Sequence, residues 1–217
     1  MTVPWETLWD KAMKALDSLE PAFPSGINWS FGGGTAMRLF YDHRESKDVD
    51  IFVTDAYVIS GLSPRLNSAT EDLTDDYNEQ SNFLKLRFPE GEVDFIVGGR
   101  LIETVSFVDK RIRGRDVRVE CPIEIVAKKC FYRAATFTAR DIFDLAVLLE
   151  EEPETVHRHR NILLAKRDVL RLRFGSMSPS TRCQIMGALD SLAVTRAYEH
   201  VRVRAIDTVL EFIRRDP

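Results

Sequence analysis

A run of three glycines followed by a strand that carries two aspartates most constrains this chain. The glycines, Gly32 to Gly34, come after the strand-like segment INWSF (27–31) and before the helical segment TAMRLFYDH (35–43). Because glycine has no Cβ, such a turn lets the backbone bend sharply and approach a ligand closely. The first N–H groups of the following helix, near Thr35, favour an anion such as a phosphate. A plain strand-to-helix turn explains one glycine more readily than three.

The segment DVDIFV (48–53) predicts a strand that places Asp48 and Asp50 on one face and three apolar residues on the other. Two carboxylates side by side repel each other unless a cation or a proton intervenes. Their oxygens suit Mg²⁺, which often bridges protein carboxylates and substrate phosphates. The alternative is an exposed strand with charges for solubility. Glycine turn, helix and acidic strand together indicate binding of a nucleoside triphosphate with Mg²⁺.

A third carboxylate is expected on a neighbouring strand. The segments NFLKLRF (82–88) and VDFIVG (93–98) predict a hairpin, in which Asp94 points away from the apolar face. Asp94 is thus a candidate to complete a trio with Asp48 and Asp50, and the alternative is a charge near a hairpin turn. A second hairpin is expected over residues 104–120, through Arg113 and Gly114.

The pattern changes at Pro122, which is well placed as a first helical residue. Helices are expected over 122–136, 138–151, 155–173, 178–190 and 193–215, in addition to one over 5–19. We therefore predict an α/β (α+β) fold, with a mixed sheet and flanking helices in residues 1–120 and a helical domain in residues 121–217.

Composition narrows the class of protein. The 217 residues include only three cysteines, without a CxxC pair, so that neither a disulfide framework nor a zinc site is expected. There is no secretory signal or membrane-spanning run, and we expect a cytoplasmic protein. The net charge of −4 divides unevenly, since residues 1–120 carry 14 Lys and Arg against 21 Asp and Glu, and residues 121–217 carry 16 against 13. The basic stretch 157–174 permits contact with a phosphate backbone, although a solvated helix face explains it as well.

The stretch GGTAMRLFYDHRESKDVDIFV resembles the first motif of the AbiEii/AbiGii-type nucleotidyltransferases, which belong to the DNA polymerase β-like superfamily. The motif is Gly-Gly-Thr, a short helix that ends in His-Arg, and Ser-x-Asp-x-Asp-x-Phe. Further resemblances are EVDFIV, with Asp94, and residues 124–149, where a lysine precedes Arg-Asp-x-x-Asp-Leu. All of them lie within residues 28–149. Many members have Glu-Lys where this chain has Lys128-Lys129, and we assign the lysine to Lys129.

The resemblance implies a set of site residues. Metal binding falls to Asp48, Asp50 and Asp94, and catalysis to these three with Lys129, Asp141 and Asp144. Nucleotide binding falls to Gly33, Gly34, Thr35, Arg44, Ser46 and Lys129.

Two of these residues have competing explanations. Thr138-x-x-Asp141 fits a capping box, and the start of a helix is the alternative role for Asp141. Asp144 cannot cap, and its expected partner is either Arg140 on its own helix or Lys129 on the preceding one. We therefore rank Asp144 above Asp141 as a site residue.

The resemblance also implies an activity. An acceptor hydroxyl would attack the α-phosphate of an NTP, with one or two Mg²⁺ ions bound, and pyrophosphate would leave. The family implies a toxin of a bacterial toxin–antitoxin or abortive-infection system, with tRNA as acceptor and an antitoxin protein as partner. Two alternatives stay open, namely transfer to a small molecule such as an antibiotic, and a non-catalytic nucleotide- or partner-binding module.

Overall fold

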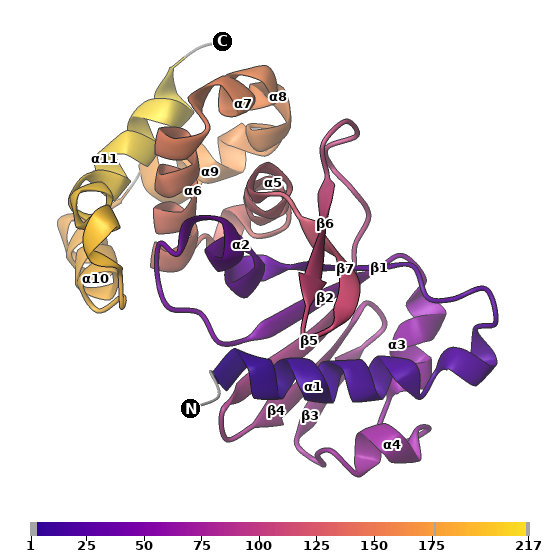
Figure 1. The fold of residues 1–217 in the computed structure, drawn as a ribbon. Coiled ribbons are helices and arrows are strands. Elements are labelled where there is room, and N and C mark those ends of the chain that lie inside the picture. The colour runs from indigo at the N-terminus through magenta and orange to yellow at the C-terminus, as the bar shows by residue number, and fades with distance from the viewer. Residues whose placement is uncertain (1–3, 176, 216–217) are drawn as a thin grey trace. The chain divides into compact units, whose positions relative to one another are not determined.

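A computed structural model describes residues 4–175 and 177–215 (Figure 1). Their contacts divide the chain into two compact units, neither of which is continuous in sequence. The first unit comprises Met1–Leu39, Ser46–Arg100 and Phe107–Glu120. The second comprises Phe40–Glu45, Leu101–Ser106 and Cys121–Pro217. None of the described helices is long and apolar enough to cross a membrane.

The first unit is built on a mixed sheet of seven strands in the order β3-β4-β5-β2-β1-β7-β6. The pairs β2–β5 and β1–β7 are parallel, and the other four pairs are antiparallel. This arrangement confirms the predicted fold class. The strands are β1 (Trp29–Gly32), β2 (Val49–Val53), β3 (Tyr77–Gln80), β4 (Phe83–Phe88), β5 (Gly91–Val97), β6 (Phe107–Ile112) and β7 (Arg115–Glu120).

Both expected hairpins are present, as β4–β5 and β6–β7. Arg113 and Gly114 make the second turn with φ of 47° and 84°, a conformation that glycine adopts at low cost. The mixed, polar sequence of residues 55–80 predicts a helix and a loop. The chain forms two helices there, α3 (Ala56–Leu62) and α4 (Ser68–Glu71), and also the edge strand β3, which was not predicted.

Helix α1 (Pro4–Asp17) lies along the apolar face of this sheet (Figure 1). The Trp9 ring meets the edge of the Phe31 ring at a centroid distance of 5.0 Å, and both side chains are buried. A 3₁₀ turn over Glu20–Ala22 ends the helical segment before β1. Because the apolar side chains of the strands point towards α1, the alternate side chains, including Asp50 and Asp94, point to the other face.

The second unit is helical. Its central helix is α6, whose buried residues pack against α5, α7, α10 and α11. The helices are α5 (Pro122–Tyr132), α6 (Ala139–Glu151), α7 (Pro153–Arg158), α8 (Arg160–Leu163), α9 (Arg167–Gly175), α10 (Pro179–Asp190) and α11 (Glu199–Arg214), with 3₁₀ turns over Ala134–Thr136 and Arg196–Tyr198. Pro122 is the first residue of α5, as expected.

The single helix expected over 155–173 is wrong. The chain forms α7, α8 and α9 there, because His159 and Leu164 adopt φ near −100° and ψ near 15° and end two helices. Each of the three helices buries one of these apolar residues: Val156 in α7, Leu163 in α8 and Leu170 in α9. The apolar spacing that predicts one helix is therefore also met by three short ones. Spacing alone does not show where an amphipathic segment bends.

Candidate active site

The glycine turn lies directly against the acidic strand. Strand β1 ends at Gly32, which is paired with Asp50 of β2, and helix α2 (Gly33–Tyr41) begins at the next residue. Gly33 has a φ of +71°, and a Cβ built on it would lie 1.9 Å from Asp50 Oδ2. A Cβ on Gly32 would lie 2.5 Å from Glu120 Oε2. Two of the three glycines are therefore required by close approach of carboxylates, which is more than a plain turn demands.

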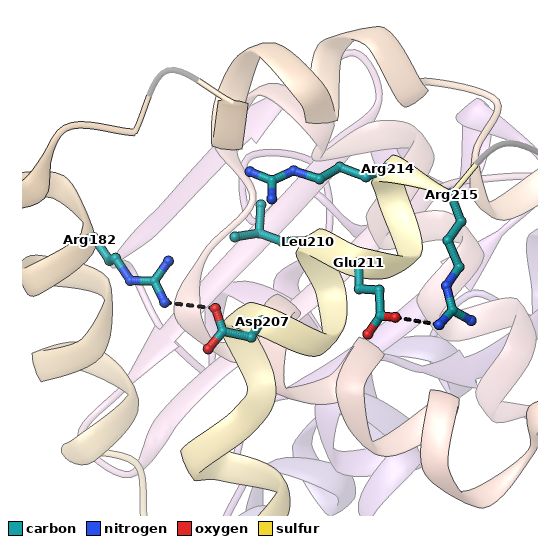
Figure 2. A pocket seen from close by; sticks show the side chains of 6 residues that line it. All are labelled: Arg182, Asp207, Leu210, Glu211, Arg214 and Arg215. Atoms are coloured by element: carbon teal, nitrogen blue, oxygen red, sulfur yellow. Dashed lines mark hydrogen bonds and ion pairs between the residues drawn. The ribbon is translucent and has the colours of Figure 1, made fainter.

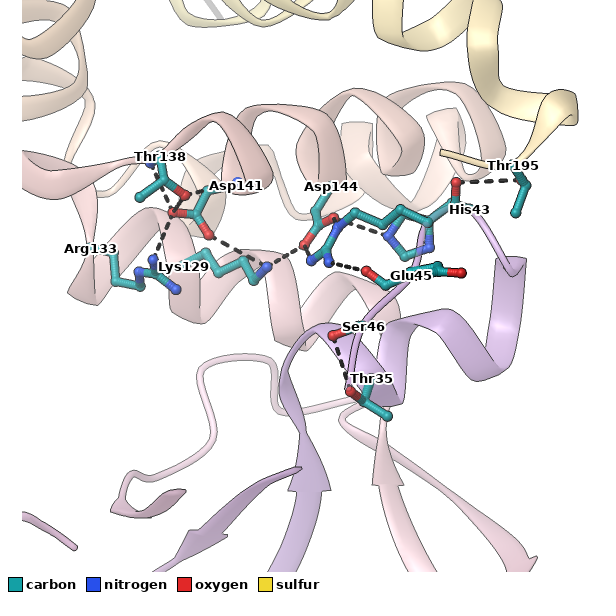
Figure 3. Close-up of polar contacts among 11 residues, drawn as sticks. Thr35, His43, Glu45, Ser46, Lys129, Arg133, Thr138, Asp141, Asp144 and Thr195 are labelled. Atoms are coloured by element: carbon teal, nitrogen blue, oxygen red, sulfur yellow. Dashed lines mark hydrogen bonds and ion pairs between the residues drawn. The ribbon is translucent and has the colours of Figure 1, made fainter. Parts of the chain in front are cut away.

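Thr35 fastens the start of α2 to the chain that enters β2. Its side chain is buried, and its hydroxyl donates to the Asp48 carbonyl oxygen at 2.5 Å. The hydroxyls of Thr35 and Ser46 lie 3.0 Å apart and share a hydrogen bond (Figure 3). The structure thus brings together Gly33, Thr35, Ser46 and Asp48 from the first motif. Because α2 starts at Gly33, two residues earlier than expected, the unpaired N–H groups of its first turn include those of the glycines.

The two central carboxylates lie side by side on the sheet. Parallel pairing of β2 with β5 sets Asp50 in register with Asp94, and residues in register project from the same face. Asp48 precedes β2 by one residue, and its Oδ1 accepts a hydrogen bond from the Glu92 N–H at 3.1 Å. Asp48 is thus turned towards the start of β5, and the residue that it contacts lies two positions before Asp94.

Asp94 has the most unusual surroundings of the three. Its Oδ2 accepts from the Lys85 ammonium at 2.9 Å, whereas its Oδ1 is buried without a hydrogen-bond partner among the described residues. Burial, with a smaller contribution from Glu92 and Asp48, raises the pKa of Asp94, although Lys85 opposes this shift. A carboxyl of raised pKa is suited to accepting a proton during a reaction.

The donor set fits a hard divalent cation in its chemistry. Asp48, Asp50 and Asp94 offer only oxygen ligands, and the unpartnered Oδ1 of Asp94 is an acceptor that a cation would satisfy. In the described part of the chain, no group of three or more His, Cys, Asp or Glu residues is gathered closely enough to hold a metal ion. Lys85 occupies the other oxygen of Asp94, so in this structure an ammonium supplies part of the positive charge.

Asp144 is the centre of a buried cluster in the second unit (Figure 3). Arg44 binds it with two hydrogen bonds, Nε to Oδ1 at 2.7 Å and Nη2 to Oδ2 at 2.8 Å. Lys129 of α5 donates to Oδ2, and His43 Nε2 lies 3.0 Å from Oδ1. Burial alone would raise the pKa of Asp144, but Arg44 and Lys129 hold it well below its ordinary value. Of the two expected partners, the structure shows Lys129, and it adds Arg44 and His43.

Asp141 does cap its helix. The Thr138 N–H donates to Asp141 Oδ2 at 2.9 Å, and the Asp141 N–H lies 3.4 Å from Thr138 Oγ1, which completes a capping box. Asp141 Oδ1 also lies 3.4 Å from the Lys129 ammonium. Lys129 is therefore held between two carboxylates of α6, and its side chain is 9% exposed.

Residues 43–45 are held in the second unit by backbone hydrogen bonds, and the side chains of His43 and Arg44 are also buried there. The Thr195 N–H donates to the His43 carbonyl at 3.0 Å, and the Glu45 N–H donates to the Ala193 carbonyl at 2.8 Å. Arg44, predicted to bind nucleotide, is only 3% exposed, and its guanidinium is directed to Asp144. His43 is fully buried and stacks on Phe143. The sequence shows the His-Arg pair but gives no sign of its partner 100 residues away.

The prediction from sequence did not include two side chains that lie on the acidic face of the sheet. Lys85 is in register with Asp94 across β4 and β5. Glu120, the last residue of β7, is fully buried and accepts from the Ser30 hydroxyl at 2.8 Å. Strand alternation could have placed both residues on this face. Each lies an even number of residues along its strand from a side chain that points to the same face.

The basic stretch 157–174 is largely used within the second unit. Arg160 donates to the Phe212 and Arg215 carbonyls at 2.7 Å, and Arg167 donates to the Ile213 carbonyl at 2.8 Å. These arginines satisfy the last carbonyls of α11 and complement its dipole.

A pocket of about 500 Å³ lies between α10 and α11 (Figure 2). Arg182 pairs with Asp207 at 2.7 Å, and Arg215 pairs with Glu211. The Arg214 guanidinium has neither a hydrogen bond nor an ion pair with the residues that the structure describes. Among the residues that the structure describes, the pocket therefore offers one arginine whose guanidinium has no partner, Arg214, and two exposed ion pairs.

The model of the AbiEii nucleotidyl transferase toxin family, of type IV toxin–antitoxin systems, matches residues 14–206. This chain belongs to that family, and it is a nucleotidyltransferase. The resemblance found in its motifs is thereby confirmed. Membership implies an NTP substrate and an antitoxin partner.

Several solved structures are similar at low identity. MenT4, a nucleotidyltransferase toxin from Mycobacterium tuberculosis H37Rv, is 18% identical, with a TM-score of 0.47 over 97% of this chain and 85% of that one. A putative nucleotidyltransferase from H. pylori is 14% identical, with a TM-score of 0.49 over 99% and 96%. ANT(2″)-Ia in complex with adenylyl-2″-tobramycin is 17% identical, with a TM-score of 0.39 over 85% and 98%. Among curated proteins there is no match.

Proposed function

We propose that this enzyme transfers a nucleoside monophosphate from an NTP to a hydroxyl of tRNA, with Mg²⁺ bound, and that it acts as a toxin. The observation that carries the proposal is the register of Gly32, Asp50 and Asp94 across three neighbouring strands. This register sets a glycine turn, suited to phosphates, beside two carboxylates suited to a cation. The toxin role and the antitoxin partner are supported by family membership.

Asp48, Asp50 and Asp94 would hold the cation, which supplies charge neutralisation for the phosphates when it is bound. The N–H groups at Gly33 and Gly34 bind a phosphate at the start of α2, and Thr35 and Ser46 fix that turn in place. The acceptor oxygen forms a bond to the α-phosphorus, and the bond to the pyrophosphate oxygen breaks. Asp94 also accepts the proton that the acceptor hydroxyl loses.

Lys129 is the proposed lysine that neutralises charge on the phosphates. Asp144 and Asp141 orient its ammonium, and Arg44 shares Asp144 with it. We propose that Asp144, Asp141 and Arg44 act through Lys129 and are positioning residues, because all three side chains are buried and paired. This assignment revises the direct nucleotide contact expected for Arg44.

We propose that the acceptor RNA contacts the arginine pocket between α10 and α11. Arg214 supplies a cation there whose guanidinium has no partner in residues 4–175 and 177–215. The exposed pairs Arg182–Asp207 and Arg215–Glu211 can exchange a carboxylate for a phosphate at little cost, since exposed ion pairs contribute at most about 1 kcal/mol. This contact adjoins the stretch 157–174 that the sequence suggested.

The first experiment incubates the protein with Mg²⁺, total bacterial tRNA and each α-³²P-labelled NTP in turn. We expect label on RNA with one NTP, no label after chelation of Mg²⁺, and no label with an Asp48→Ala/Asp50→Ala variant. Asp116→Ala, on an exposed position of β7, is the matched acidic control and should keep full activity. Label on an antibiotic hydroxyl instead of RNA would contradict the proposed acceptor, and NTP binding without any transfer would contradict the proposed reaction.

A further inference from the structure

Lys85 stands at the end of a row of charged residues that crosses the sheet. Antiparallel pairing sets Lys85 of β4 opposite Asp94 of β5, and parallel pairing sets Asp94 beside Asp50 of β2. The Lys85 ammonium donates to Asp94 Oδ2 at 2.9 Å and also pairs with Glu92. Its side chain is 24% exposed, so much of its aliphatic part lies on the sheet. The predicted hairpin contains Lys85, but none of the stretches that resemble the family includes this residue.

The two oxygens of Asp94 are in different situations because of Lys85. Oδ2 is held by the ammonium, whereas Oδ1 is buried and has no partner among the described residues. A hydrogen bond to one oxygen restricts rotation of the carboxylate and so determines where the other oxygen points. Lys85 thus presents Oδ1, the oxygen that a cation would contact.

The charge of Lys85 has a second effect. A cation that binds Asp94 must approach a fixed ammonium, and like charges at short range disfavour one another. The triphosphate of a nucleotide brings negative charge that offsets this repulsion. A divalent cation should therefore bind weakly to the protein alone and more tightly together with a nucleotide.

We propose that Lys85 is a positioning residue for nucleotidyl transfer, which fixes the Asp94 carboxylate and makes binding of the divalent cation depend on the nucleotide. This inference rests on the proposed function of the same carboxylates. It separates two properties that a general structural defect would reduce together, because loss of Lys85 should strengthen cation binding while it slows the reaction.

The test measures binding of Mn²⁺ alone by electron paramagnetic resonance, and transfer kinetics separately. For Lys85→Met we expect the affinity for Mn²⁺ without nucleotide to rise about fivefold, as expected for removal of a nearby like charge. We expect kcat to fall roughly 100-fold, the loss typical of a misplaced catalytic group. KM for the NTP should stay within about threefold of the wild-type value. Lys85→Arg keeps the charge and the hydrogen bond, and should restore weak Mn²⁺ binding and most of kcat.

Lys14→Met is the matched control, since Lys14 is exposed on α1, the helix that covers the opposite face of the sheet. Unchanged or weaker Mn²⁺ binding by Lys85→Met, in a variant with a wild-type melting temperature, would overturn the inference. So would a Lys85→Met enzyme with wild-type kcat. The Mn²⁺ measurement needs no turnover, so tighter binding would support the role of Lys85 towards the cation even if the wild-type protein transferred no nucleotide to RNA.

Discussion

Gly33 combines a backbone conformation and a close contact that no other residue type tolerates together. Its φ is +71°, and a Cβ would lie 1.9 Å from Asp50 Oδ2. Either Asp50 or the start of α2 must move to admit a methyl group, and both belong to the proposed site. A conformational penalty of about 1–2 kcal/mol adds to this displacement.

We expect Gly33→Ala to reduce transfer activity by roughly 100-fold, because a displacement of about 1 Å in a catalytic group has that effect. Gly26→Ala is the control, since Gly26 has a similar φ of +79° but no atom within 4 Å of its would-be Cβ. The control should lose stability by a similar penalty, measured by thermal unfolding, and keep its activity. Equal loss of activity in both variants would mean that backbone strain, and not the contact with Asp50, explains the requirement for glycine.

Asp144 is the residue whose loss should destabilise the protein most. Asp144→Asn leaves Arg44 and Lys129 as buried cations without their shared carboxylate, which should cost about 3–5 kcal/mol in the free energy of unfolding. Asp207→Asn breaks an exposed pair with Arg182 and should cost less than about 1 kcal/mol. Urea unfolding at neutral pH compares the two, and equal effects would contradict the central role given to Asp144.

The same residue should govern stability in acid. The pKa of Asp144 is lowered in the folded protein, even though burial alone would raise it, since Arg44 and Lys129 favour the ionised form. A group with a lowered pKa contributes its full stability above its ordinary pKa of 3.8, and loses it as the pH falls towards the folded value. The wild-type free energy of unfolding should therefore decline below about pH 4, and Asp144→Asn should decline less steeply. Parallel pH profiles would contradict this assignment.

The positions of individual candidate residues were predictable where the signal was local. Alternation along β2 and β5 placed Asp50 and Asp94 on one face, and the spacing of Thr138 and Asp141 indicated the capping box. The pairing of Arg44 with Asp144 joins positions 100 residues apart, and no periodicity encodes such a contact. The resemblance named Arg44 as a functional residue without showing that it is buried.

Among the secondary-structure elements, strands and hairpins were predicted better than the later helices. Turn residues such as Gly114 mark where a hairpin reverses, so both ends of a strand carry a signal. The breaks between α7, α8 and α9 carry no glycine or proline, and the arginines that follow them reach the carbonyls at the end of α11. Such tertiary contacts override local preference, and a sequence does not reveal them.

Helices α10 and α11 together form the arginine pocket, which is the proposed contact for RNA. Arg214→Ala should weaken tRNA binding and reduce the slope of log K against log salt by about 1, as expected for loss of one phosphate contact. Arg111→Ala removes an equally exposed arginine from the β6–β7 hairpin and should leave the slope unchanged. Fluorescence anisotropy over a salt series measures both, and equal slopes for wild type and Arg214→Ala would exclude this pocket as the contact.

For the whole molecule, the important property is that the two compact units interleave along the chain. Residues 40–45 and 101–106 belong to the helical unit, although the segments on either side of each belong to the sheet unit. The division of charge at residue 120 therefore does not coincide with the division into units. Arg44, from the first half of the sequence, binds Asp144 inside the helical unit. The sheet and the helices were predictable from pattern, but the exchange of these short segments was not.

The excursion at residues 40–45 constrains how this protein can diversify. A crossover near residue 120 that joined this sheet unit to the helical part of another chain would carry His43 and Arg44 along while replacing their partner Asp144. The chimera would keep two buried basic side chains, and the helical part from the other chain would have to supply a carboxylate that matches them. Recombination should therefore succeed only between chains that share both halves of this pairing, so the two parts are inherited as a set.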